Sequence, residues 1–264
     1  MKFGRILAGA VIFVILAFIA KNLIFSDYNR LKKSVVRKFG SCVPSSWGEV
    51  VKGVKTRLDT KRPVLALTLD ACGSKGDGFD ADLINYLVKE KIPVTLFISG
   101  KWMDKNPEIF KDLSKNNLFE IENHGLEHRP CSVKGNSAYG IKGTDSASGA
   151  MDEIELNSQK IKSLTGHKPK FYRSGTAYYD EVAVEIASHL GYQVIGFSVI
   201  GDAGATYSKE QIKKALLKGI WPGEIMLCHM NHPECETAEG LIEAIPELEK
   251  MGFRFVKLRN YKLK

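Results

Sequence analysis

The chain has 264 residues, of which 44% are hydrophobic and 26% charged, and these values exclude a disordered chain, a collagen-like repeat and a small disulfide-stapled scaffold. The length is sufficient for one large domain with a substantial core. Most of the net charge of +8 lies in residues 1–40, which hold eight basic side chains and one acidic one. Residues 41–264 therefore carry a net charge of only +1, and we expect no nucleic-acid partner.

The first element of the chain is a membrane or export signal. Apolar residues and glycine run without interruption for 15 residues from Ile6 to Ala20, and Lys2 and Arg5 precede them. A charged start and a run of this length are typical of a secretory signal peptide. Phe18, however, stands where a small residue is needed if cleavage follows Ala20, and this favours an uncleaved anchor.

We therefore expect residues 1–25 to be a signal anchor or a signal peptide, with an N-terminal hydrophobic helix over residues 6–25 in contact with the membrane. The rest of the chain is then expected outside the cytoplasm, either anchored to the membrane or, if the N-terminus is cleaved, secreted or periplasmic. Residues 26–60 are mostly polar and are interpreted as a basic tether and lead-in segment. Residues 61–264 are interpreted as one globular domain.

Beyond residue 60, short apolar runs alternate with segments of helical spacing. The expected strands, in chain order, cover residues 64–69, 93–99, 118–122, 170–172, 193–199, 224–228 and 253–258. The expected helices cover residues 81–91, 108–113, 151–164, 181–190, 210–217 and 237–250, and the Gly- and Ser-rich stretch 130–149 is expected to be a long loop. This alternation favours a parallel sheet, and seven or eight strand–helix units in roughly 200 residues favour an α/β barrel over two separate domains.

Five polar residues lie at or just beyond the ends of the expected strands, namely Asp70, His124, Arg173, Asp202 and His229. In a parallel barrel the carboxyl ends of all strands meet on one face, where active sites are built. Taken singly, each residue also has an ordinary interpretation as a helix cap, a turn residue, an ion pair or a core histidine. Their shared position at strand ends predicts that they converge in one site.

His124 is followed four residues later by His128, and two imidazoles at this spacing can share one divalent ion. Two unrelated loop histidines are the alternative interpretation. Gly125 and Pro130 disfavour a long regular helix here, so we expect a site in a loop that follows a strand.

Five short motifs occur in chain order between about residues 62 and 260. They are Thr68-Leu69-Asp70-Ala71, His124-Gly-Leu-Glu-His128, Phe171-Tyr172-Arg173-Ser174-Gly175, Gly201-Asp202-Ala203 and Leu227-Cys228-His229. Their order and spacing resemble those of the polysaccharide deacetylase family, the NodB-homology enzymes of carbohydrate esterase family 4. The resemblance implies that residues 61–264 form a catalytic domain, a distorted (β/α) barrel of seven or eight parallel strands. It also implies metal-dependent hydrolysis of N-acetyl groups on an envelope or extracellular polysaccharide.

The resemblance further implies a role for each residue. Asp70 would be the general base toward the attacking water, and Arg173 would orient it. His229 would protonate the leaving amine, with Asp202 tuning the pKa of its imidazole. The expected substrate-binding residues are Leu227, beside the acetyl methyl group, and Thr176, whose backbone N–H could help to hold the oxyanion.

One divalent metal is expected on His124 and His128, with zinc as the first choice and cobalt, nickel or manganese as alternatives. The family usually has two adjacent acids in its first motif, but Ala71 takes the place of the second here. Either Asp70 is the base and the metal lacks a carboxylate ligand, or Asp70 is itself a ligand and the base lies elsewhere. Cys72 is a candidate substitute ligand.

The altered first motif also motivates two other interpretations. One is a hydrolase of the same fold that cleaves another amide, an ester or a ureide, and the other is a non-catalytic glycan-binding domain. The five cysteines leave at least one thiol unpaired. Cys72 and Cys131 either form a bridge between site loops or are buried as small hydrophobic residues.

Overall fold

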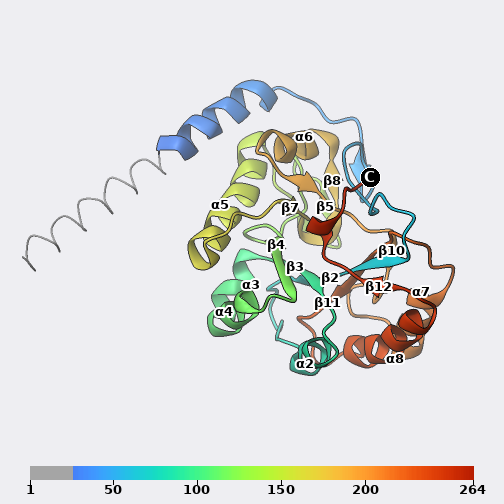
Figure 1. Ribbon diagram of the computed structural model, residues 1–264. Helices are drawn as coiled ribbons and strands as arrows, with labels where there is room; N and C mark the ends of the chain where they lie inside the picture. The colour runs from blue at the N-terminus through green and yellow to red at the C-terminus, as the bar shows by residue number, and fades with distance from the viewer. Residues whose placement is uncertain (1–25) are drawn as a thin grey trace, which may run out of the picture.

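A computed structural model describes residues 26–264 and shows a mixed α/β fold around one curled parallel sheet (Figure 1). The strands are β1 (Trp47–Gly48), β2 (Val64–Ala71), β3 (Val94–Ile98), β4 (Phe119–Asn123), β5 (Ser137–Ala138), β6 (Ile141–Lys142), β7 (Phe171–Tyr172), β8 (Tyr179–Asp180), β9 (Gln193–Val194), β10 (Val199–Ile200), β11 (Ile225–His229) and β12 (Arg254–Phe255). The helices after the N-terminal one are α2 (Ala81–Lys89), α3 (Gly100–Lys105), α4 (Pro107–Lys115), α5 (Ala147–Thr165), α6 (Glu181–His189), α7 (Lys209–Leu217) and α8 (Thr237–Lys250), and there are short 3-10 turns at Gly175–Ala177 and Leu258–Asn260.

The central sheet has eight strands, and all of its pairings are parallel. Seven follow the order β10-β11-β2-β3-β4-β7-β9, and β12 pairs with β2 outside this path. All eight residues of β2 are buried, as expected for a central strand covered on both faces. The prediction of a distorted barrel of seven or eight parallel strands is confirmed.

The helices pack around the outer surface of the curled sheet (Figure 1). On one side α8 packs against α2 and α7, and on the other α5 packs against α4 and α6. Five helices begin at a side chain that accepts a backbone N–H of the first turn, which satisfies one of the otherwise unpaired donors there. These N-caps are Asp80, Ser99, Ser146, Asp180 and Ser208.

One expected strand, residues 193–199, is instead two strands at opposite edges of the sheet, so this prediction was wrong. β9 pairs with β7, whereas β10 pairs with β11, and only residues 195–198 separate them. Four residues cannot reach across a flat sheet of this width. The sheet must therefore curl until its two edges lie close together.

The lead-in segment fills the gap between these two edges. Lys55 forms a parallel bridge to Ile195, next to β9, and Arg57 forms an antiparallel bridge to Glu224, next to β11. Gly196 permits this approach, because a Cβ there would lie 2.9 Å from a methyl carbon of Val54. The sheet is thus closed by chain that precedes its first strand.

The expected tether is partly ordered, because residues 26–39 are helical. Val35 and Phe39 are buried in a hydrophobic cluster with residues of α5 and α6, and Lys32 forms an ion pair of 2.6 Å with Asp152 of α5. The expected signal segment, residues 1–25, lies outside the described residues. Within residues 26–264, no helix has both the length and the apolar composition needed to cross a membrane.

The long loop predicted over residues 130–149 contains the short hairpin β5–β6 and the first residues of α5. Thr144 holds the loop together, since its N–H donates to the carbonyl of Pro130 and its hydroxyl accepts the N–H of Ser132 at 2.9 Å. The loop is therefore anchored at both of its ends.

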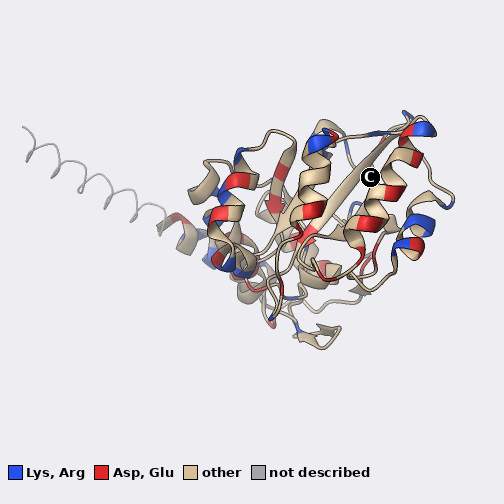
Figure 2. Cartoon of the chain, turned by 90° about the horizontal axis from the view of Figure 1, so that it is seen from below, with Lys and Arg blue, Asp and Glu red and all other residues tan. Residues whose placement is uncertain are grey.

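The surface charges of the globular part are mixed. In the view of Figure 2, Lys and Arg occur beside Asp and Glu on the same helices. This agrees with the low net charge of residues 41–264.

Candidate active site

The five polar residues predicted at strand ends meet at the carboxyl-terminal edge of the sheet. Asp70 lies near the end of β2 and His229 at the end of β11, where the two residues pair in register. His124, Arg173 and Asp202 lie one or two residues beyond β4, β7 and β10. A cavity of about 610 Å³ opens at this edge. The predicted site residues that line it are Asp70, His124, His128, Thr176, Leu227 and His229.

Arg173 is completely buried beneath the cavity and orients Asp70. Its guanidinium donates to Asp70 Oδ1 at 2.7 Å and to Thr68 Oγ1 at 2.9 Å. It also donates to the carbonyl oxygens of Ile195, 3.2 Å away, and Gly196, 2.9 Å away. Because a buried charge requires paired donors and a counter-charge, this network fixes the guanidinium and one oxygen of the Asp70 carboxylate.

The second carboxylate oxygen of Asp70 lies beside His124. The distance from Asp70 Oδ2 to His124 Nε2 is 3.5 Å. His124 Nδ1 lies 3.0 Å from the carbonyl oxygen of Arg173, and because a carbonyl only accepts, Nδ1 must carry the proton. The lone pair of Nε2 is therefore free and directed toward the same space as the carboxylate.

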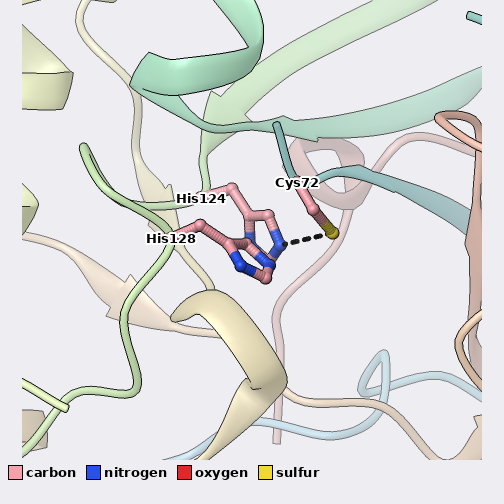
Figure 3. Close-up of side chains that lie close together, drawn as sticks. All are labelled: Cys72, His124 and His128. Carbon is pink, nitrogen blue, oxygen red and sulfur yellow. Dashed lines mark hydrogen bonds between the residues drawn. The ribbon is translucent and has the colours of Figure 1, made fainter. Parts of the chain in front are cut away.

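Three donor atoms gather at this point, from Cys72, His124 and His128 (Figure 3). All lie within 4.8 Å of one another, and all three side chains are buried. Cys72 Sγ lies 3.9 Å from His124 Nε2. Burial lowers the pKa of both histidines, which favours the neutral imidazole, the form that binds a metal.

Cys72 supplies the third donor, and Ala71 does not face the cavity. Residues two apart in an extended chain point to the same side, and Asp70 and Cys72 both line the cavity. Ala71 packs in the hydrophobic core with Leu83 and Ile98. A thiol thus stands among the donors of a site whose first motif lacks its second acid.

This donor set fits a divalent metal of the zinc type. Tetrahedral zinc, with bonds of about 2.3 Å to sulfur and about 2.0 Å to imidazole nitrogen, separates two such ligand atoms by about 3.5 Å. The 3.9 Å between Cys72 Sγ and His124 Nε2 is close to that spacing. The pairing of His124 Nδ1 with a backbone carbonyl is also the usual support of a metal-binding imidazole.

His128 reaches the donor set through a left-handed backbone conformation, with φ of 58°. Gly175 makes this arrangement possible, because a Cβ there would overlap the backbone of His128. The Glu153 carboxylate of α5 accepts the N–H groups of Glu127 and Arg129, each at 3.0 Å, and so holds the loop from both sides of His128. Burial raises the pKa of Glu153 to about 7. Sequence reasoning missed Glu153, since its role depends on α5 packing against a distant loop.

The half-buried His229 at the end of β11 pairs with Asp202, which is buried just beyond the neighbouring strand β10. His229 Nδ1 lies 2.9 Å from Asp202 Oδ1, and the His229 backbone N–H donates to Asp202 Oδ2 at 2.7 Å. The hydroxyl of Thr237 donates to the same Oδ2 at 3.1 Å. Burial lowers the pKa of His229, but the charge and hydrogen bond of Asp202 outweigh burial, and the net pKa is well above its ordinary value. The contact with Asp202 therefore favours the protonated form of the imidazole, which lines the cavity.

The two expected acetyl-binding residues also lie at the cavity. Thr176 and the following Ala177 both have left-handed φ values, 75° and 56°. Within residues 26–264, the buried Oγ1 of Thr176 has no hydrogen-bond partner, so a polar atom remains for a ligand to satisfy. Leu227 adds an apolar, half-buried surface.

All five cysteines lie in the described part of the chain, and none of them forms a disulfide there. The alternative of a bridge between Cys72 and Cys131 is therefore wrong. Cys131 packs in the hydrophobic cluster that contains Met151 and Tyr179.

The family model for polysaccharide deacetylases matches residues 57–195, which is more than half of the chain. Among characterised proteins, the chain is 24% identical to the peptidoglycan-N-acetylmuramic acid deacetylase PdaA of Bacillus subtilis, over 75% of this chain and 70% of PdaA. It is also 24% identical to a peptidoglycan-N-acetylglucosamine deacetylase of Bacillus cereus, over 79% of this chain and 94% of that protein.

Among solved structures, a pseudoenzyme of carbohydrate esterase family 4 from Bacillus anthracis superposes with a TM-score of 0.67. The match covers 80% of this chain and 69% of that one, at 20% sequence identity. It shows that the two chains share a fold.

Proposed function

The chain belongs to the polysaccharide deacetylase family, and from this premise we propose that it removes N-acetyl groups from an envelope or extracellular polysaccharide by metal-dependent amide hydrolysis. The observation that carries the proposal is the cavity that brings Asp70, His229 and a buried Cys–His–His donor set to one edge of the sheet. The names of the two characterised relatives point to peptidoglycan as the class of substrate. A site outside the cytoplasm follows from such a substrate.

The metal would be held by Cys72, His124 and His128. A divalent ion there would act as a Lewis acid toward the amide carbonyl and the attacking water. Thiolate and imidazole together favour zinc over the harder manganese ion. The carboxylate of Asp70, 3.5 Å from His124 Nε2, then remains free to act as the base.

The residues of the chain divide the two proton transfers between them. Asp70, held by Arg173 on one oxygen, accepts a proton from the attacking water. His229, kept cationic by Asp202, donates a proton to the amine as it leaves, since an amine is a poor leaving group until it is protonated. The backbone N–H near Thr176 would stabilise the negative oxygen that develops on the carbonyl.

Amine release from N-acetylated oligosaccharides and peptidoglycan fragments by the purified chain tests this proposal. We expect equimolar amine and acetate, loss of both with a chelator, and recovery on addition of zinc. Turnover of acetyl esters or ureides without any amine release from glycans would instead support a hydrolase of another substrate class.

A non-catalytic glycan-binding domain is the second candidate, and Ala71 is the observation that favours it. The Bacillus anthracis protein of similar fold is itself described as a pseudoenzyme. Against this candidate, Asp70, Arg173, His229 and Asp202 keep a complete set of hydrogen-bonded contacts. Binding of glycan without turnover of any substrate, even when the protein is loaded with zinc, would decide for it.

Replacement of Cys72 by serine should weaken zinc binding by at least about 10–100-fold, the loss seen when only an outer partner of a ligand is removed. The physical reason is that serine remains a neutral hydroxyl where cysteine binds as a thiolate. Zinc affinity is measured by competition with a chromophoric chelator. In the cobalt-loaded protein, the near-ultraviolet band of a thiolate–cobalt bond should be present before the substitution and absent after it.

Cys42→Ser serves as the matched control, because Cys42 lies outside the cavity and is only half-buried. If the Cys72→Ser variant has the zinc affinity of the unaltered chain and an unchanged cobalt band, Cys72 is not a metal ligand.

The substitution Asp202→Asn should move the alkaline limb of the kcat/KM profile to lower pH. The carboxylate of Asp202 raises the pKa of His229, so the active imidazolium is lost only as pH rises through that raised value. Without the negative charge the pKa of His229 falls, and the loss begins at lower pH. Asp77→Asn is the control, because it removes another carboxylate that lines the cavity and should leave the alkaline limb of the profile in place. If the alkaline limb does not move in Asp202→Asn, His229 is excluded as the acid.

A further inference from the structure

Tyr139 occupies an unfavourable position at the tip of the β5–β6 hairpin. The two strands are joined by Tyr139 and Gly140 alone, and both have positive φ values, 51° and 75°. A two-residue loop with two left-handed residues favours Asn-Gly or Gly-Gly, and a bulky side chain is strained at its first position. The backbone preference of this turn therefore does not explain the tyrosine.

The ring of Tyr139 belongs to a row of three aromatic side chains from distant parts of the sequence. Tyr139 packs edge-to-face against Tyr178, with ring centres 5.6 Å apart, and Tyr178 packs against Trp47 at 5.7 Å. The hydroxyl of Tyr139 donates to Glu49 Oε1 at 3.3 Å. We call these three rings the aromatic wall.

One ring of the aromatic wall, that of Tyr139, borders the active-site cavity, and Tyr178 and Trp47 pack behind it. Tyr139, Ile141 and Glu49 line the same cavity as Asp70 and His128. Although Tyr139 contacts Tyr178, it is 73% exposed, the largest exposure of any aromatic side chain that borders the cavity in the described part of the chain. A large apolar surface is thus held open to solvent at the mouth of the site.

The position of the wall relative to the metal donors is fixed. Arg129 directly follows His128, and its guanidinium donates to the carbonyl oxygens of Lys142 and Gly143 at the base of the hairpin. The N–H of Gly143 donates to the carbonyl of Asn136 at 3.1 Å and closes the hairpin on its other side. The hairpin therefore cannot move without disturbing the loop that carries His128.

We propose that the aromatic wall is a sugar-binding subsite, in which Tyr139 stacks on the pyranose ring next to the one whose N-acetyl group enters the cavity. The proposal rests on the proposed function. A polymer that delivers one sugar to the cavity must pass over its rim, and the C–H face of a pyranose matches an exposed aromatic ring. The Glu49 carboxylate next to the ring can accept hydrogen bonds from sugar hydroxyls.

The test compares kcat and KM on N-acetylglucosamine oligomers of one to six sugars, using the full chain. Tyr139→Asn removes the ring and introduces the residue preferred at this turn, and Tyr139→Phe keeps the ring. We expect Tyr139→Asn to raise KM about tenfold on oligomers of four or more sugars, with kcat on short substrates unchanged and the thermal midpoint equal or higher. Tyr139→Phe should keep KM within about twofold of the original value.

Trp221→Ala is the matched control. Trp221 is 67% exposed and precedes the amino-terminal end of β11, at the opposite edge of the sheet from the cavity. The KM of the Trp221→Ala variant should therefore equal that of the unaltered chain. A lower thermal midpoint and a uniform loss of kcat in Tyr139→Asn would assign the ring a structural role and overturn the proposal. An unchanged KM at every oligomer length would overturn it as well, while leaving the proposed function intact.

If the unaltered chain releases no amine from any oligomer, the proposed function fails. Binding of the hexamer is then measured by calorimetry. Weaker binding by Tyr139→Asn than by the unaltered chain would support the aromatic wall as a glycan subsite on its own. Equal affinities, or an absence of binding by the unaltered chain, would overturn it.

Discussion

Replacing His124 or His128 by alanine is expected to remove the bound metal and to lower kcat/KM for amine release by about 1000-fold or more. The expectation follows because a catalytic metal supplies several kcal/mol of stabilisation to charge that develops in the transition state. Each histidine provides one donor of the buried Cys72–His124–His128 set. Metal content by elemental analysis and amine release should fall together.

His167→Ala is the matched control, because His167 is exposed and lies outside the cavity. Circular dichroism and the thermal midpoint separate loss of metal from loss of fold. If both His124→Ala and His128→Ala keep their metal and their activity, then Cys72, His124 and His128 do not form the catalytic metal site.

Asp70→Asn is expected to lower kcat by about 10²–10⁴-fold and to leave the metal bound. An amide has the shape of the carboxylate but cannot accept the proton of the attacking water. The same substitution leaves Arg173 buried without its counter-charge, which should lower the free energy of unfolding by about 3–5 kcal/mol. Urea denaturation measures the second effect, and steady-state kinetics measures the first.

A double substitution separates the two effects of Asp70. In Asp70→Asn with Arg173→Met, the unpaired buried charge is gone, so part of the stability should return while activity remains lost. Loss of the metal in Asp70→Asn would give a different answer, since Asp70 would then be a ligand and the base would lie elsewhere. The experiment thus distinguishes the two interpretations that the altered first motif allows.

Much of the site could be predicted because strand ends can be located from the sequence. The apolar run before Asp70 and the one before His229 end at the cavity, and parallel pairing brings their ends to one edge. Asp202 stands between glycines as an ordinary turn residue would, and only the family resemblance assigns it to His229. The pairing of β10 with β11 is what brings the two side chains together.

Other features had no local signal in the sequence. The run 193–199 is apolar enough for one strand, but the close approach of the lead-in segment at Gly196 divides it between two edges. Glu153 is one of many charged residues on a helix, and it became part of the site only through its contacts with the loop around His128. Tyr139 likewise stands out only because of its left-handed backbone conformation, which the amino-acid sequence does not predict.

The hydrogen bonds of Arg173 link the Asp70 carboxylate to the folding of the whole sheet. The same guanidinium that holds Asp70 also donates to Ile195 and Gly196, in the short crossover between the two sheet edges. Unfolding of the crossover therefore also removes the support that orients the Asp70 carboxylate. Under the proposed mechanism, a chain that is still incompletely folded at this crossover would therefore be unable to hydrolyse its substrate.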